Sequence, residues 1–195
     1  MTVSRTRDML VDVARQLFAR KGVDDTTMND IAQASGKGRR TLYTYFKSKN
    51  EIFLAVVESE MAQLHKVLMD VVNKELPADE KLITFIYTRL DAIKAVVFRN
   101  GTLRAVFFRD IWRVEKVRKE FDLQEVEMLK SILDEGVRDG IFSVPDTDIT
   151  AMVLHHALKG LEVPYIRGVM GASITDRIKR RDNVINLIFN GIKIK

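Results

Sequence analysis

Apolar residues recur every three or four positions along most of the chain, which is the period of an α-helix and not that of a β-strand. Residues 5–21 show the pattern clearly, because Leu10, Ala14, Leu17 and Phe18 would share one helical face. No clear alternating strand pattern or internal repeat is present. The spacing therefore predicts an all-α fold of about nine helices. They cover residues 5–21, two short segments between 28 and 46, and residues 49–74, 79–98, 102–111, 114–139, 147–163 and 174–190.

Polar residues and breakers mark where these helices begin and end. Thr27 with Asp30, three residues on, forms a capping-box pattern that predicts a helix start near Met28. The same pattern recurs at Ser48 and Glu51, and again at Ser173 and Asp176. Pro145-Asp146-Thr147 predicts a further cap, and the stops are expected at Gly22, Pro77, Gly140 and Pro164, the last of which should interrupt its helix.

Composition narrows the class of protein. With 195 residues, of which 46% are hydrophobic and 30% charged, the chain is typical of a globular protein. No stretch is apolar for long enough to span a membrane, and the amino terminus lacks a signal-peptide pattern, so we expect a cytoplasmic protein. The absence of cysteine excludes disulfides and thiolate catalysis. His155-His156 has no third ligand pattern, and no nucleophile elbow or phosphate-binding loop is present, so neither an enzyme nor a cofactor is expected.

The net charge of +5 lies entirely in the first quarter of the chain. Residues 1–49 carry ten lysines and arginines against five acids, and no acid occurs between Asp30 and Glu51. The segment ASGKGRRTLYTYFKSK, residues 34–49, holds five basic side chains and two tyrosines. A local cationic surface is what a polyanion binder needs, although a solvated basic face would have the same composition.

A short helix, a glycine and a second short helix surround this basic segment. Ala32 is small enough for close helix packing, and Gly36, four residues later, suits a left-handed turn. Leu42, six residues further, would anchor the second helix, with Ile31 and Phe46 completing an apolar underside. This spacing is that of a helix-turn-helix, whose second helix enters the DNA major groove.

Residues 22–53, GVDDTTMNDIAQASGKGRRTLYTYFKSKNEIF, resemble the DNA-binding segment of the TetR (tetracycline-repressor) family of bacterial regulators. One departure is Lys37-Gly38-Arg39-Arg40, where valine, serine, lysine and a small residue are more common. Gly38 is a weaker helix cap than serine, which predicts a looser start of the recognition helix. The resemblance implies a DNA-binding domain over residues 1–50 and a helical effector-binding and dimerisation domain over residues 51–195.

The DNA contacts can be assigned residue by residue. Thr27 would hold a phosphate at a helix start, and Lys49 would combine its charge with a helix dipole. Tyr43 and Tyr45 could donate hydroxyls to phosphates, although Tyr45 could equally pack against the core. Arginine would read guanine and a threonine methyl would read thymine. For Lys37, Arg39 and Lys47 the alternative is a charge that is simply solvated. The full set of residues predicted to contact DNA is Thr26, Thr27, Lys37, Gly38, Arg39, Arg40, Thr41, Tyr43, Thr44, Tyr45, Lys47 and Lys49.

The resemblance also implies sites in the second domain. The helix at 147–163 is apolar almost all round, and the last helix carries a broad isoleucine face. Both would pack against a second copy, with Val153, Leu161, Ile178, Ile185 and Ile188 in the interface, and the alternative is an ordinary internal core. Aromatic residues of the middle helices could wall an effector pocket or fill a core. The predicted pocket residues are Phe85, Phe107, Trp112, Met152 and His156.

We therefore expect a ligand-responsive transcriptional regulator, a repressor that a small and largely apolar effector releases from an inverted-repeat operator. Its partners would be double-stranded DNA, the effector and a second copy of the chain, with no membrane. The alternative is an architectural protein that coats DNA without sequence choice. Such a protein needs basic residues over a large surface, whereas this chain concentrates them beside one helix.

Overall fold

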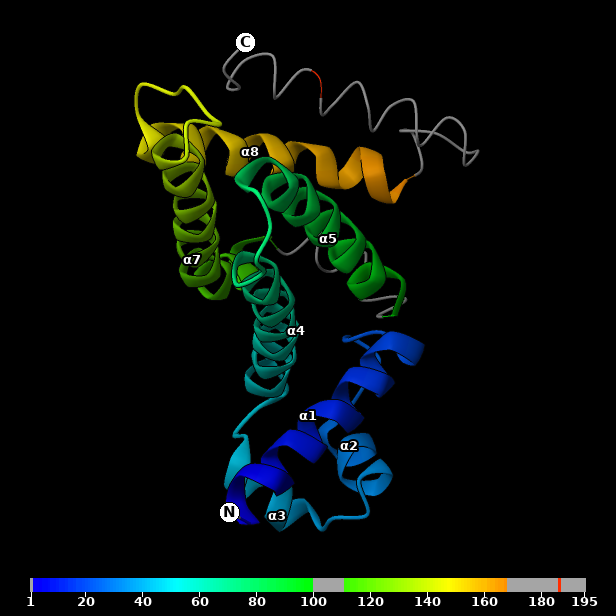
Figure 1. Cartoon of the computed structure of the whole chain (residues 1–195). Coiled ribbons are helices and arrows are strands. Elements are labelled where there is room, and N and C mark those ends of the chain that lie inside the picture. Colours follow the sequence, from blue (N-terminus) through cyan, green and yellow to red (C-terminus); the bar gives the residue numbers. More distant parts are fainter. Residues whose placement is uncertain (1, 100–110, 168–185, 187–195) are drawn as a thin grey trace. The chain divides into compact units, whose positions relative to one another are not determined.

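The computed structural model describes residues 2–99, 111–167 and 186, and every regular element in these ranges is an α-helix (Figure 1). The helices are α1 (Thr2–Lys21), α2 (Met28–Ala34), α3 (Arg39–Tyr45), α4 (Lys49–Val72), α5 (Ala78–Arg99), α7 (Ile111–Arg138) and α8 (Thr147–Ile166). The predicted all-α class is confirmed. Apart from residues 111 and 186, the helices predicted at 102–111 and 174–190 lie outside the described residues.

The caps predicted for α2, α4 and α8 form local hydrogen bonds, whereas the one predicted at Ser173 and Asp176 lies outside the described residues. The Asp30 N–H donates to the Thr27 hydroxyl over 3.1 Å, and the Thr27 N–H donates to the Asp30 carboxylate over 2.9 Å, so the capping box of α2 is complete. At α4 the Glu51 N–H donates to the Ser48 hydroxyl over 3.2 Å. The Glu51 carboxylate, however, accepts from the N–H of Lys47 over 2.7 Å, one residue earlier than a capping box requires.

Helix ends follow the predicted breakers with one exception. Gly22 and Gly140, which follow α1 and α7, adopt positive φ angles of 91° and 70°. The prediction that Pro164 interrupts its helix is wrong, because α8 continues through it to Ile166. A proline removes one N–H donor from the helix. Because the N–H of Arg167 still bonds the Val163 carbonyl over 3.0 Å, the last turn closes around the proline.

Contacts group the chain into two compact units. Unit 1 comprises residues 1–63 and 95–120, and unit 2 comprises residues 64–94 and 121–195, so α4, α5 and α7 each contribute residues to both. The two units are defined by contacts alone, so they do not test the boundary that we predict between a DNA-binding domain and an effector-binding domain at residues 50 and 51. That boundary stays a prediction. None of the helices in the described residues is long and apolar enough to cross a lipid bilayer.

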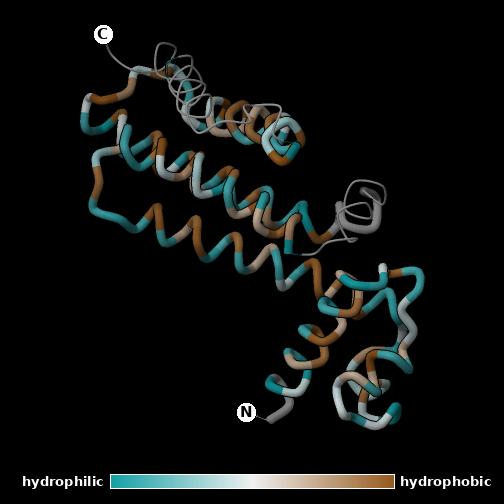
Figure 2. The backbone as a smooth tube through the Cα atoms, turned by 90° about the vertical axis from the view of Figure 1, so that its right-hand side faces the viewer, coloured by the Kyte–Doolittle hydropathy of each residue, from teal (hydrophilic) through white to brown (hydrophobic). Residues whose placement is uncertain are grey.

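Each unit has its own apolar core, and Figure 2 shows the alternation of apolar and polar positions along the helices that builds them. The core of unit 1 joins α1, α2, α3 and the first half of α4 around Leu10, Phe18, Ile31, Leu42 and Phe53. The rings of Phe18 and Phe53 meet edge to face with centroids 6.2 Å apart. The core of unit 2 joins α4, α5, α7 and α8 around Leu68, Phe85, Leu129, Phe142 and Leu158.

Candidate nucleic-acid interface

The turn between α2 and α3 has the geometry that the sequence predicts. Gly36 takes a left-handed conformation with φ of 63°, which a side chain would disfavour. The N–H of Lys37 closes the turn on the Ala32 carbonyl over 3.1 Å. Ala32, Leu42 and Phe46 are all buried in the core of unit 1. The apolar side of α3 is therefore fixed, and its opposite side faces solvent.

The start of α3 has no side-chain cap, as expected for Gly38. The Gly38 carbonyl accepts the N–H of Leu42 over 3.1 Å, so the first turn is held by the main chain alone. A helix start presents several N–H groups that intrahelical bonds do not use, and these favour an anion. The missing cap leaves the predicted basic residues next to such donors.

The outer side of α3 is cationic and aromatic. Tyr43 is 43% exposed, and its neighbours on this side are also exposed: Lys37, Arg39, Arg40, Thr44 and Lys47. Thr41 and Tyr45 are partly buried, and Tyr45 packs against the core of unit 1, as the packing alternative proposed. The Thr44 hydroxyl donates to the Arg40 carbonyl over 2.9 Å. The exposed set combines long cations with one accessible phenol.

Thr26 and Thr27, next to each other before α2, differ in their surroundings. Thr27 is exposed, whereas Thr26 is fully buried and its hydroxyl donates to the Gly22 carbonyl over 2.7 Å. The Thr26 side chain thus closes the loop after α1, and its placement suits a structural role. Hydrogen bonds from the Thr27 main chain and hydroxyl lower the pKa of Asp30, whose carboxylate lies 3.9 Å from the Lys21 amine.

Lys49 is the first residue of α4, and its amine donates to the Asp24 carbonyl over 2.9 Å. This bond joins the start of α4 to the loop before α2, a contact between residues far apart in the sequence. An ammonium group has three donors, so the bond to Asp24 leaves donors that can reach a phosphate. Sequence reasoning placed Lys49 correctly at the helix start and missed its structural partner.

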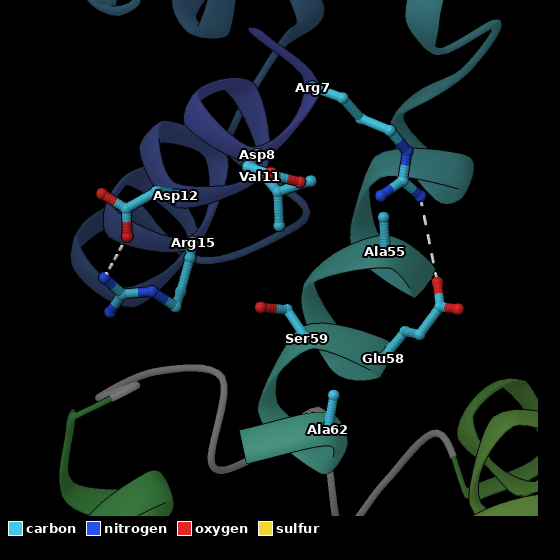
Figure 3. Close-up of a pocket in the computed structure, with 9 residues that line it drawn as sticks. All are labelled: Arg7, Asp8, Val11, Asp12, Arg15, Ala55, Glu58, Ser59 and Ala62. Carbon is cyan, nitrogen blue, oxygen red and sulfur yellow. Dashed lines mark hydrogen bonds and ion pairs between the residues drawn. The ribbon is translucent and has the colours of Figure 1, made fainter. Parts of the chain in front are cut away.

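Sequence reasoning also missed the contacts that Arg7 of α1 makes with Phe46, just after α3, and with Glu58 of α4. The Arg7 guanidinium lies 5.4 Å from the centroid of the Phe46 ring and 3.9 Å from the Glu58 carboxylate. A groove of about 310 Å³ lies between α1 and α4, and its lining includes Arg7 and Val11 from α1 and Ala55 and Glu58 from α4 (Figure 3). Of the predicted effector residues whose side chains are described, Phe85, Met152 and His156, none lines this groove.

Glu60 of α4 is a buried carboxylate in unit 1. Its oxygens pair with the Arg99 guanidinium and, over 3.8 Å, with the Nε of Arg15. Glu60 thereby joins α4 to α1 and to the end of α5. The amino-acid sequence gives no sign of this pairing, because Arg15, Glu60 and Arg99 are far apart along the chain.

The predicted effector residues divide between core, surface and undescribed parts of the chain. Phe85 is fully buried in the core of unit 2, whereas Met152 is 47% exposed and His156 is also exposed. Phe107 and the side chain of Trp112 lie outside the described residues, although Trp112 is in the first turn of α7. The three side chains that are described differ in burial, and the assignment of all five to an effector pocket stays a prediction.

The predicted interface residues are described only on α8. Val153 is 57% exposed, beside exposed Ile149 and Met152 on the same face. Leu161 is partly buried and packs against the core of unit 2. Ile178, Ile185 and Ile188 lie outside the described residues. The α8 helix thus buries one apolar face and exposes another, and the interface stays a prediction.

A charged cluster lies inside unit 2 where the sequence suggested only apolar packing. Arg89 of α5 is 1% exposed and bonds to Glu125 of α7 through Nε and to Glu162 of α8 through Nη2, the latter over 2.7 Å. Burial lowers the pKa of the Arg89 guanidinium, but the charges of the two carboxylates outweigh burial and raise it above its ordinary value. His155, also buried, bonds Glu125 through Nδ1 over 3.0 Å.

In this region α3 exposes a basic side and packs its apolar side against the core, and a tight turn joins it to α2. This arrangement defines a helix-turn-helix DNA-binding protein. Residues 10–56 match the sequence model described as "Bacterial regulatory proteins, tetR family". The HTH-type transcriptional repressor KstR2 of Mycolicibacterium smegmatis is 30% identical over 148 residues, which are 73% of this chain and 70% of that protein. The chain belongs to the TetR family of bacterial transcriptional regulators, as its sequence motif indicated.

Solved structures extend the likeness of fold to nearly the whole chain. A transcriptional regulator from Cytophaga hutchinsonii superimposes with a TM-score of 0.75 and 23% identity, covering 96% of this chain and 98% of that one. A transcriptional regulator from Saccharomonospora viridis, solved in complex with choline, gives a TM-score of 0.73 and 19% identity over 98% of this chain and 100% of that one. Both likenesses show the shared fold.

Proposed function

We propose that this regulator is a repressor that binds an inverted-repeat operator as a homodimer and leaves it when a small, largely apolar effector binds. The observation that carries the DNA-binding part is the exposed cationic side of α3. Leu42 and Phe46 hold the helix by its buried side, while Arg39, Arg40 and Tyr43 remain exposed. A helix held in this way can enter a major groove without rearranging the core.

The basic residues divide by the contact that each can make. Arg40, in the first turn of α3, can form two hydrogen bonds to the edge of a guanine. Tyr43 and Lys49 would contact phosphates, and such contacts fix the register of a protein on DNA without reading its sequence. Exposed Lys37 and Lys47 flank the helix and add attraction to the backbone.

The exposed apolar face of α8 supports the homodimer. Ile149, Met152 and Val153 follow the helical repeat, and large apolar side chains that share a face favour a partner surface. Two-fold symmetry would then place two recognition helices about 34–36 Å apart, which is one turn of DNA. This spacing is the reason for proposing an inverted-repeat operator.

Two observations support a small effector. The core of unit 2 contains Phe85 among aliphatic residues, which suits a largely apolar molecule. The structural neighbour from Saccharomonospora viridis was solved with choline, so this fold can be bound by a small organic molecule. A coupling of about 1–3 kcal/mol between effector and operator would change DNA affinity by roughly 5–150-fold.

Selection of binding sites from random duplex DNA, followed by electrophoretic mobility shifts, tests the proposal. We expect an inverted repeat to emerge and to bind far more tightly than random DNA of equal length. Arg40→Ala should cost about 1–3 kcal/mol and relax preference at one or two positions. Lys49→Ala should weaken binding to all sequences and reduce the salt slope by about one phosphate contact.

The matched control is Arg138→Ala, which removes an exposed arginine at the end of α7. It should change neither affinity nor sequence preference. Equal affinity of the wild-type protein for selected and random DNA would favour the architectural alternative and overturn the proposal. A preference that survives Arg40→Ala unchanged at every position would remove the assigned base contact.

A further inference from the structure

The charged cluster in unit 2 gathers residues from three helices inside an apolar core. Arg89 comes from α5, Glu125 from α7, and His155 and Glu162 from α8. Each of the four is buried. Phe85 lies one turn before Arg89 on the same face of α5, so the cluster adjoins the aromatic residue that we assign to the effector pocket.

Two nitrogen atoms of this cluster have no hydrogen-bond partner among the described residues: Nη1 of Arg89 and Nε2 of His155. The other Arg89 donors are engaged, Nε by Glu125 and Nη2 by Glu162. The nearest acid to the His155 Nε2 is Asp122, whose Oδ1 lies 3.7 Å away, beyond hydrogen-bond distance. Buried polar atoms are nearly always paired, so each of these two requires an explanation.

The cluster is also an unusual way to fill a core. A buried ion pair stabilises a protein less than well-packed apolar side chains of similar volume, because each charge loses its hydration. Arg89 already pairs with the carboxylates of Glu125 and Glu162, and one carboxylate would be enough to balance its single positive charge. A second role for Arg89 would account both for the charged core and for the donor left over at Nη1.

We propose that Arg89 is the polar anchor of the effector site and that Nη1 donates a hydrogen bond to a neutral oxygen of the effector, such as a ketone or amide carbonyl. This inference rests on the proposed function and adds the chemical class of the effector: an apolar molecule with one uncharged oxygen acceptor. The apolar part lies against the Phe85 side, and the oxygen accepts the hydrogen bond from Nη1.

The charges around Arg89 select against an ionic effector. An anionic group would meet Glu125 and Glu162 on the same guanidinium, with Asp122 close to His155. A cationic group would be attracted by these acids but repelled by Arg89, and it has no acceptor for Nη1. A neutral carbonyl accepts from Nη1 and leaves both existing ion pairs intact.

A series of eight-carbon probes tests this assignment on the full-length wild-type protein. Calorimetry would compare 2-octanone with 2-methyl-1-octene, in which a methylene group replaces the carbonyl oxygen, and with octanoate and octylammonium. One hydrogen bond to a charged donor should make 2-octanone bind roughly 10- to 100-fold more tightly than the alkene. Equal binding of the two, or no binding of 2-octanone, would overturn the inference and would mean that water or nothing satisfies Nη1.

Arg89→Lys then identifies the donor. The lysine keeps a positive charge beside Glu125 and Glu162 but lacks Nη1, so the preference for 2-octanone should fall to about that of the alkene. Arg99→Lys is a matched change on the same helix, at an exposed arginine that pairs with buried Glu60, and it should leave the preference intact. A preference that persists in Arg89→Lys, or disappears in Arg99→Lys as well, would refute the role of Nη1.

Mobility shifts with the selected operator separate this inference from the proposed function. If the protein selects no operator, the proposed function fails whatever the probes do. If it binds an operator but the wild-type protein does not distinguish 2-octanone from the alkene, only the assignment of Arg89 fails. If 2-octanone binds preferentially and also weakens operator binding, both are supported.

Discussion

Gly136 of α7 is the position where a single methyl group should most clearly destabilise unit 2. A Cβ at Gly136 would lie 2.1 Å from Cδ2 and 2.5 Å from Cε2 of Phe142. Phe142 is 2% exposed and belongs to the core of unit 2. Its ring cannot simply move aside, because the Gly136 carbonyl accepts the N–H groups of both Ile141 and Phe142, over 2.8 and 3.0 Å.

The magnitude follows from two opposing effects. Overpacking a core destabilises a protein by about 1–3 kcal/mol. Alanine in place of glycine inside a helix stabilises it by roughly 0.5–1 kcal/mol. The clash at Gly136 involves ring carbons held by the main chain, so we expect Gly136→Ala to destabilise by about 1–2 kcal/mol. For a chain of this size, that change corresponds to a fall in unfolding midpoint of about 2–8 °C.

Thermal unfolding followed by circular dichroism measures the effect, with Gly160→Ala as the matched control. Gly160 lies within α8, and a Cβ there would meet nothing within 4 Å, so helix propensity alone should raise the midpoint. In a Phe142→Leu background the harm from Gly136→Ala should shrink, because the ring is gone. If Gly136→Ala raised the midpoint as Gly160→Ala does, the packing argument would be refuted.

Two further predictions concern acid stability and assembly. The pKa of Asp30 is lowered below its ordinary value of 3.8, so its ionised form stabilises unit 1 above that pH and this stabilisation is lost as pH falls through the lowered value. Denaturant unfolding should therefore show a lower free energy of unfolding for Asp30→Asn than for wild type at neutral pH, and this difference should disappear in acid. A difference that stays constant with pH would contradict the lowered pKa of Asp30. Val153→Asp places a charge on the exposed face of α8 and should yield monomers in sedimentation, whereas Val137→Asp, at another exposed valine, should not; dimers of both would exclude this face as the interface.

The helix-turn-helix could be predicted because its determinants are local. The capping box at Thr27, the glycine turn at Gly36 and the apolar anchors Leu42 and Phe46 each act within a few residues of one another. Signals between residues that are close in the sequence can be recognised from the sequence alone, and the structure confirms the capping box, the glycine turn and both anchors. The α8 boundary was predicted less well, because one proline near a helix end removes only a single hydrogen bond and does not decide where the helix stops.

The charged core of unit 2 could not be predicted from local pattern. Arg89 is 36 residues from Glu125 and 73 residues from Glu162, and no periodicity connects such distant positions. A weaker signal was nevertheless present. Arg89 follows Phe85 and Ile86 at helical spacing, so it occupies a position on α5 where the pattern calls for an apolar residue.

The same exception occurs on the two neighbouring helices. Glu125 precedes buried Met128 and Leu129 by three and four positions on α7, and Glu162 follows buried Leu158 by four positions on α8. One charge on an apolar face is unremarkable in a helix, since its side chain can reach solvent. Three such charges on three helices, of complementary sign, are better explained by mutual pairing inside the core. Because residues that break a folding pattern are expected at functional sites, this coincidence gives the strongest reason to place effector recognition at Arg89 instead of at the exposed residues of α8.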